Sequence, residues 1–94
     1  MIRSFANKHT KDVFFRRRSR YLPPEIHIRA KMKLLLIDAA SSLEDLKIPP
    51  GNRLEQLQGR RSDQWSIRIN QQWRICFQWN DGDAWNVEIV DYHR

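Results

Sequence analysis

The residue types best suited to chemistry gather at two places, an arginine pair and a polar run near the end of the sequence. Arg68 and Arg74 lie in the neighbouring segments "QWSIRIN" and "QWRICFQWN", and the last apolar segment leads directly into Asp91, Tyr92 and His93. The planar fork of an arginine binds phosphate well. A histidine can act as general acid or base near neutral pH. Together these residue types suit acid–base chemistry on an anionic substrate.

RNA is the anion that such a set would process most simply, because its 2′-hydroxyl is a nucleophile already within the substrate. A protein that cleaves RNA must align this hydroxyl with the phosphorus, move two protons and neutralise the developing charge. We therefore take Arg74, Asp91, Tyr92 and His93 as candidate catalytic residues, with Tyr92 either stacking on a base or donating its hydroxyl. The alternative interpretation of residues 91–93 is a polar strand end without a catalytic role.

Other kinds of site find no support in the sequence. The three histidines and the single cysteine do not show metal-ligand spacing, and no glycine-rich phosphate loop is present. Cys76 lacks a nearby partner in the sequence that would activate it as a nucleophile. We therefore expect neither a metal nor another cofactor.

The charge of the chain favours a polyanionic partner. The 94 residues carry a formal net charge of +6 and predict one domain, residues 1–94. One dense run contains Arg16, Arg17 and Arg18, and a second group includes Arg60 and Arg61. A single run is often only a solvated face, but two groups on one small domain favour phosphate binding. With one cysteine, no apolar run of about 18 residues and no signal-peptide pattern, we expect a protein of a reducing cytoplasm without membrane contact.

The elements that must position these residues follow from periodicity and turn signals. We predict a short strand at 1–5, a helix at 7–18 capped by Asn7 or Thr10, a longer helix from 25 to about 40, and a helical turn at 41–46. After residue 52 the period changes to two, which predicts strands near 53–59, 64–70, 72–80 and 85–90. This pattern predicts an α+β domain, with N-terminal helices on one face of a mainly antiparallel sheet.

Alternation along the strands predicts which side chains the helices cover. The odd-numbered positions should form the core against Met32, Leu35 and Leu36 of the long helix, and the other face should be polar and open. The expected core residues of the strands are Trp65, Ile67, Ile69, Trp73, Ile75, Phe77, Trp79, Val87 and Ile89, with Trp85 on the same side.

The strand register should bring the candidate site together. A connection at 70–72 would place Arg68 opposite Arg74, and pairing of Trp79 with Trp85 would place Arg74 beside Val90. Residues 91–93 would then be held near Arg74. Like charges opposite each other are unfavourable in a sheet, so we expect an anion at the two arginines.

The segments "RLEQLQG", "WSIRINQQWRICFQW" and "DGDAWNVEIVDYH", with the opening "MIRSF", resemble the HigB toxins of bacterial toxin–antitoxin systems, within the RelE/ParE superfamily. The resemblance covers nearly the whole chain. It implies a RelE-like fold with a curved sheet. It also implies a metal-free endoribonuclease that cleaves mRNA in the ribosomal A site and so inhibits translation.

The resemblance also assigns roles to residues. The family's catalytic arginine matches Arg74 and the terminal "DYH" matches Asp91, Tyr92 and His93, while Arg68 matches a strand arginine less closely. Gln58 stands where family members often carry a lysine, and Glu55 where some carry a histidine. Arg60 or Arg61 would have to supply the missing charge at Gln58, so weaker toxicity is one expectation.

The implied partners are a cognate HigA-type helix-turn-helix antitoxin, the ribosome with its RNA and A-site message, and operator DNA reached only through the antitoxin. The antitoxin is expected on the helical side, away from the catalytic face. Arg16, Arg17 and Arg18 would contact either ribosomal RNA or the antitoxin. Two other functions stay open: a non-catalytic RNA- or protein-binding module on the same fold, and a gyrase poison like the ParE branch.

Overall fold

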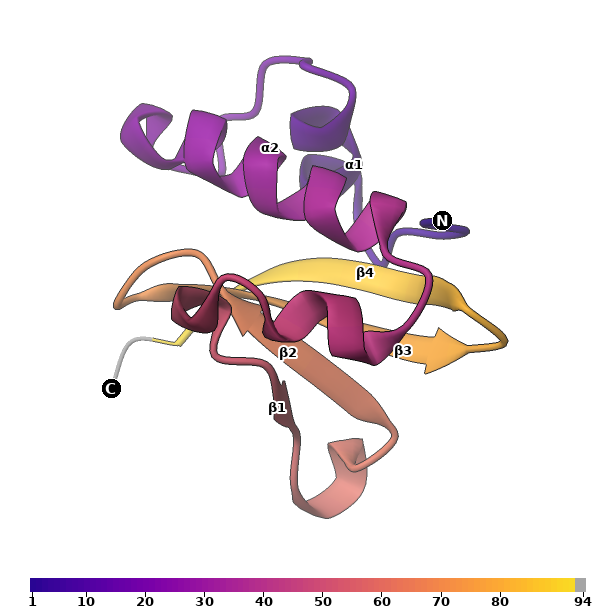
Figure 1. Ribbon diagram of the computed structural model, residues 1–94. Helices are drawn as coiled ribbons and strands as arrows, with labels where there is room; N and C mark the ends of the chain where they lie inside the picture. Colours follow the sequence, from indigo (N-terminus) through magenta and orange to yellow (C-terminus); the bar gives the residue numbers. More distant parts are fainter. Residues whose placement is uncertain (93–94) are drawn as a thin grey trace.

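Two helices cover one face of a four-stranded antiparallel sheet in the computed structural model, which describes residues 1–92 (Figure 1). The elements are α1 (Lys8–Phe14), α2 (Pro24–Ala39), β1 (Glu55–Gln56), β2 (Gln64–Arg68), β3 (Trp73–Asn80) and β4 (Asp83–Asp91). Three 3-10 turns lie between α2 and β2: η1 (Leu43–Lys47), η2 (Pro50–Asn52) and η3 (Gly59–Arg61). The strand order is β1-β2-β3-β4. The predicted α+β fold is confirmed.

Local sequence signals set the ends of the helices. Asn7 caps α1, because its side-chain oxygen accepts a hydrogen bond from the Thr10 amide at 3.0 Å. The helix ends before Arg16, whose φ of 57° is left-handed. Helix α2 begins at Pro24, where the missing N–H costs nothing. The first helix is therefore shorter than predicted and the second has nearly its predicted length.

The core-facing side of α2 differs from the prediction. Met32, Leu35 and Leu36, which were expected in the core, are 60%, 45% and 37% exposed. The buried stripe contains Ile26, Ala30, Leu34 and Ile37 instead. Both stripes obey helical spacing, so periodicity alone could not choose between them. The exposed stripe leaves an apolar surface on α2 that no described segment covers.

Strand β4 is tied to the opening segment of the chain. A two-residue turn at Asp81 and Gly82, both with positive φ, joins it to β3. Instead of a predicted strand at residues 1–5, isolated parallel bridges connect Ile2 to Ala84 and Phe5 to Val87. The Ile89 amide also donates a hydrogen bond to Thr10 Oγ1 at 2.9 Å.

Because β4 contains a β-bulge, one predicted strand pair is wrong and another is confirmed. Trp79 pairs with Ala84, not with Trp85, which is 40% exposed. An irregularity between the Cys76 and Gln78 pairs then inserts one extra residue into β4, so that Arg74 still pairs with Val90 as predicted. The bulge shifts the side-chain alternation, which places Ala84 in the core.

The sheet face away from the helices is not open as predicted. Ser66, Arg74 and Cys76 on this face are buried, with exposed fractions of 0%, 8% and 0%. Figure 1 shows β1 and the following turn extending below the sheet, on the side opposite the helices. Arg61 of η3 reaches β4, where its Nη2 lies 3.4 Å from Glu88 Oε1. The face is therefore concave and partly covered.

The expected strand core is otherwise largely confirmed. Ile67, Ile69, Ile75, Phe77 and Val87 are fully buried, and Ile89 nearly so, while Trp65, Trp73 and Trp79 pack against this cluster with partial exposure.

Candidate active site

The end of the sheet nearest the described chain end carries a pocket of about 870 Å³, here called the sheet-end pocket. It forms where β2 ends, β3 begins and β4 ends. Its lining residues are Arg53, Glu55, Arg68, Asn70, Gln71, Gln72, Arg74 and Tyr92. The volume falls in the range of about 300–1,000 Å³ typical of ligand sites. The predicted gathering of Arg68, Arg74 and Tyr92 is confirmed.

Arg74 is held rigidly inside this pocket. Its Nε donates to Ser66 Oγ at 2.9 Å, and its Nη2 donates to the Arg53 carbonyl at 2.7 Å. A longer contact of 3.4 Å joins Nη2 to the Ser66 carbonyl. A guanidinium fixed by its neighbours in this way is preorganised to meet a phosphate without moving.

Arg68 and Arg74 pair directly across β2 and β3, as predicted. Their guanidinium groups bind different partners, since Arg68 Nε donates to the Asn70 carbonyl at 3.0 Å. Within residues 1–92 neither forms an ion pair with a carboxylate. The uncompensated positive charge is what an anionic ligand would neutralise.

Tyr92 forms a wall of the pocket. Its amide donates to the Gln72 carbonyl at 2.6 Å, which anchors the residue after β4, and the Arg74 guanidinium lies 5.8 Å from the ring centroid. Burial raises the pKa of the Tyr92 hydroxyl, and its hydrogen bond with Cys76 raises it further. Burial likewise raises the pKa of the Cys76 thiol. Both groups are therefore protonated at neutral pH.

The remaining candidate catalytic residues lie at or beyond the rim. Asp91 is exposed and accepts a hydrogen bond from Gln72 Nε2 at 3.2 Å, but it is not among the residues that line the pocket. His93 lies outside the described residues.

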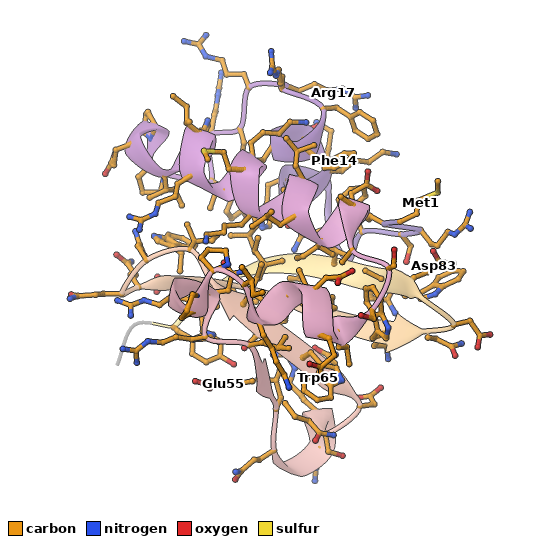
Figure 2. All side chains as sticks on the ribbon, viewed as in Figure 1. Met1, Phe14, Arg17, Glu55, Trp65 and Asp83 are labelled. Atoms are coloured by element: carbon orange, nitrogen blue, oxygen red, sulfur yellow. The ribbon has the colours of Figure 1, made fainter. Side chains whose placement is uncertain are left out.

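Two charged pocket residues, Arg53 and Glu55, were not among the predicted site residues. Arg53 follows η2 with a left-handed φ of 46°, and its carbonyl holds Arg74 while its side chain lines the pocket. Figure 2 shows Glu55 extending from β1 on the side where the described chain ends. Two sequence signals were available: Arg53 follows directly on the "PPGN" turn that leads into the sheet, and Glu55 stands where the resemblance places a histidine in some relatives.

The other predicted RNA-binding residues lie elsewhere. Gln58 and Arg60 are exposed around η3 and do not line the pocket, and Arg61 is occupied by Gln64 and Glu88. Of the three arginines that line the pocket, Arg53 lies nearest in the sequence to Gln58, the position at which the resemblance to the family suggested a lysine. Arg16, Arg17 and Arg18 line a different groove, beside Ile28, Met32 and Leu35 of α2.

The pocket combines three arginines with one carboxylate, Glu55, and one aromatic ring. Such a set can bind a phosphate, stack against a base and exchange a proton at the carboxylate. Among residues 1–92 there is no group of three or more His, Cys, Asp or Glu side chains placed to hold a metal ion. The same described part of the chain contains no helix of the length and apolarity needed to cross a membrane.

Comparison with known proteins identifies similar chains. The model of the family described as RelE-like toxin of type II toxin–antitoxin system HigB matches residues 3–93. Toxin HigB-1 of Vibrio cholerae serotype O1 is 45% identical over 78 residues, covering 83% of this chain and 81% of the relative. Endoribonuclease HigB of Proteus vulgaris is 34% identical over 93 residues, covering 99% and 100%.

Proposed function

Because the chain belongs to the HigB family of RelE-like toxins from type II toxin–antitoxin systems, we propose that it is a metal-independent endoribonuclease that cuts mRNA in the ribosomal A site. Translation stops on the cut message, in the bacterial cytoplasm. The Proteus vulgaris relative is named an endoribonuclease, which supports this activity.

The observation that carries the proposal is the fixed guanidinium of Arg74 among uncompensated cations. Three arginines surround the sheet-end pocket, and Arg74 is clamped by Ser66 and Arg53. A rigid, partly desolvated donor is worth more to a developing charge than a mobile surface one. A binding module would not need its central arginine held in this way.

In the proposed reaction the 2′-oxygen of one nucleotide attacks the adjacent phosphorus. The bond from phosphorus to the 5′-oxygen breaks, one proton leaves the 2′-hydroxyl and one reaches the departing 5′-oxygen. Arg74, with Arg68, neutralises the extra negative charge on the phosphoryl oxygens. Tyr92 offers its ring to a base. Asp91 and His93 are the proposed proton carriers.

A cell-free translation reaction with a defined message tests this proposal. Primer extension maps cuts made by the parent, with and without ribosomes and with EDTA added to the ribosome-free arm. Arg74→Lys keeps the charge but loses the fork, and Tyr92→Phe keeps the ring but loses the hydroxyl. Arg20→Ala removes an exposed arginine that does not line the sheet-end pocket and serves as the control.

We expect cuts at A-site codons only with ribosomes, lost or strongly reduced in Arg74→Lys and retained in Tyr92→Phe and Arg20→Ala. Uncut message with a folded parent protein would favour the non-catalytic binding module instead. Cutting by Arg74→Lys at the parent rate would show that the reaction does not need the guanidinium fork at position 74.

The antitoxin of this system is proposed to be a HigA-type helix-turn-helix protein that binds the helical side and carries the pair to operator DNA. The exposed stripe of α2, with Ile28 at 77% and Met32 at 60%, supports this position. A groove of about 500 Å³ there has an arginine rim at residues 16–18. Those cations and the apolar floor together suit an acidic, amphipathic segment. This placement favours the antitoxin over ribosomal RNA as the partner of Arg16, Arg17 and Arg18.

Met32→Asp tests the antitoxin site. The variant should remain toxic, because Met32 lies outside the sheet-end pocket, but co-expressed antitoxin should no longer rescue growth. Full rescue would place the antitoxin on another surface.

A further inference from the structure

A second hollow adjoins the sheet-end pocket on the side of α2, here called the helix-side pocket. It has a volume of about 520 Å³ and is lined by Arg29 and Lys33 of α2, by Pro49 and Gly51, and by residues 68–71. Arg68, Asn70 and Gln71 line both hollows. The two pockets therefore form one path that crosses the connection between β2 and β3.

The helix-side pocket is cationic and lacks internal compensation. Arg29 and Lys33 are four residues apart on α2, so their side chains lie on one face and repel each other. Within residues 1–92 neither of them forms an ion pair, and neither does Arg68 between the pockets. Some cations elsewhere in the described chain are paired, among them Arg3 with Asp83 at 3.0 Å.

Lys33 is also held in position. Its Nζ donates to Asn52 Oδ1, and Asn52 is fully buried and bonded to the carbonyls of Leu46 and Ile48. Burial lowers the pKa of Lys33, and the nearby charge of Arg29 lowers it further. An anion between these two side chains would relieve the repulsion.

We propose that the helix-side pocket binds a phosphate of the same RNA strand that occupies the sheet-end pocket, with Arg29 and Lys33 as its ligands. This inference rests on the proposed function, since it extends the substrate of that site beyond the cleaved bond. Continuity through Arg68 favours the message itself, because one strand can pass from pocket to pocket. Asn70 and Gln71 lie along the path, where a sugar or base would cross.

Binding of non-cleavable RNA tests the path without requiring catalysis. The probes are 2′-O-methyl oligonucleotides of two and eight nucleotides, titrated against the purified protein over a range of salt concentrations. The variants are Arg29→Ala and the double variant Arg29→Ala/Lys33→Gln. Lys11→Ala removes an exposed helical cation that lines neither pocket and is the matched control.

The measured quantity is the slope of the logarithm of the binding constant against the logarithm of the salt concentration. For the longer probe we expect the magnitude of this slope to fall by about 0.7 in Arg29→Ala and by about 1.4 in the double variant. One lost contact then corresponds to roughly fivefold weaker binding at 0.1 M salt, vanishing near 1 M. The two-nucleotide probe and the Lys11→Ala control should behave like the parent. Thermal melts check that each variant is folded. If Lys33→Gln destabilises the protein through the lost bond to Asn52, the test is decided by Arg29→Ala alone.

Three outcomes would overturn the proposal. The parent could bind both probes equally, or Arg29→Ala could bind the longer probe as the parent does. The third outcome is that Arg29→Ala binds vacant ribosomal subunits, titrated in the same way, more weakly than the parent but binds the oligonucleotides equally well. The last outcome would assign Arg29 and Lys33 to ribosomal RNA. Failure of the proposed function would be seen separately, as absent cuts in the translation reaction with these binding results unchanged.

Discussion

Replacing Arg74 by alanine should destabilise the protein, because this arginine is part of the structure as well as a candidate catalytic group. The change removes the bonds to Ser66 Oγ at 2.9 Å and to the Arg53 carbonyl at 2.7 Å. A hydrogen bond from a charged donor contributes about 1.5–3 kcal/mol, and a buried acceptor left unpaired has a cost of similar size. Relief of repulsion from the neighbouring arginines offsets part of the loss.

We expect the free energy of unfolding to fall by about 2–3 kcal/mol, which corresponds to roughly 10–20 °C in Tm for a domain of this size. Urea unfolding followed by far-UV circular dichroism measures this change. The free energy of unfolding of Arg74→Lys should lie between those of the alanine variant and the parent. Arg68→Ala removes one hydrogen bond from a less buried side chain, so it should lower the free energy of unfolding by less than Arg74→Ala does.

The reasoning would be refuted if Arg74→Ala unfolded within about 0.5 kcal/mol of the parent, the range of ordinary surface substitutions. The prediction also bears on toxicity assays. Loss of growth inhibition in Arg74→Ala alone would mix two causes, a missing phosphate ligand and a smaller folded fraction.

Three further predictions concern other parts of the molecule. Arg53→Gly should keep or raise Tm, because glycine tolerates the left-handed φ of 46° and the carbonyl that holds Arg74 remains, yet cleavage in the translation reaction should fall; unchanged cleavage would exclude the Arg53 side chain from the site. Phe77→Ala should cost about 3–5 kcal/mol in urea unfolding because Phe77 is fully buried, whereas Trp85→Ala at the bulge should cost clearly less; equal costs would contradict the bulged register. The hydrogen bond from Arg3 and the nearby amino terminus lower the pKa of Asp83, so its contribution to stability is present above its unfolded pKa of about 3.9 and is lost as the pH falls through the lower folded value. Asp83→Asn should therefore lower Tm at pH 7 and flatten its decline below about pH 4, and parallel melting curves for parent and variant from pH 7 to pH 2 would disprove this.

The end of the sheet that carries the candidate site could be predicted from alternation and the short connections, although one step of that prediction was wrong. Pairing of Trp79 with Trp85 assumed a longer turn and regular strands. The protein has a tight turn at Asp81 and Gly82 and one extra residue in β4, and these two differences cancel before Arg74. Turn chemistry was readable in "NDGD", whereas a bulge has no comparably short sequence signal.

The orientation of α2 could not be predicted, because the helix carries apolar residues around most of its circumference. Ala30 is fully buried, and its small side chain allows the helix to approach the sheet closely. A periodicity argument prefers the larger Met32 and Leu35, which face outward. Burial of Arg74 was missed for a related reason: its contact with the Arg53 carbonyl depends on the path of the chain after η2, which follows no sequence periodicity.

The links between β4 and the start of the chain have a consequence for biosynthesis. The first helix is joined to the last strand through Thr10 and Ile89, and the opening residues bridge to Ala84 and Val87. These contacts span almost the whole sequence, so a nascent chain cannot close its core until β4 has left the ribosomal exit tunnel. Tyr92 and the end of β4 also complete the sheet-end pocket. A truncated translation product that lacks β4 would therefore have neither a closed core nor a complete pocket, which ties activity to completion of the last strand.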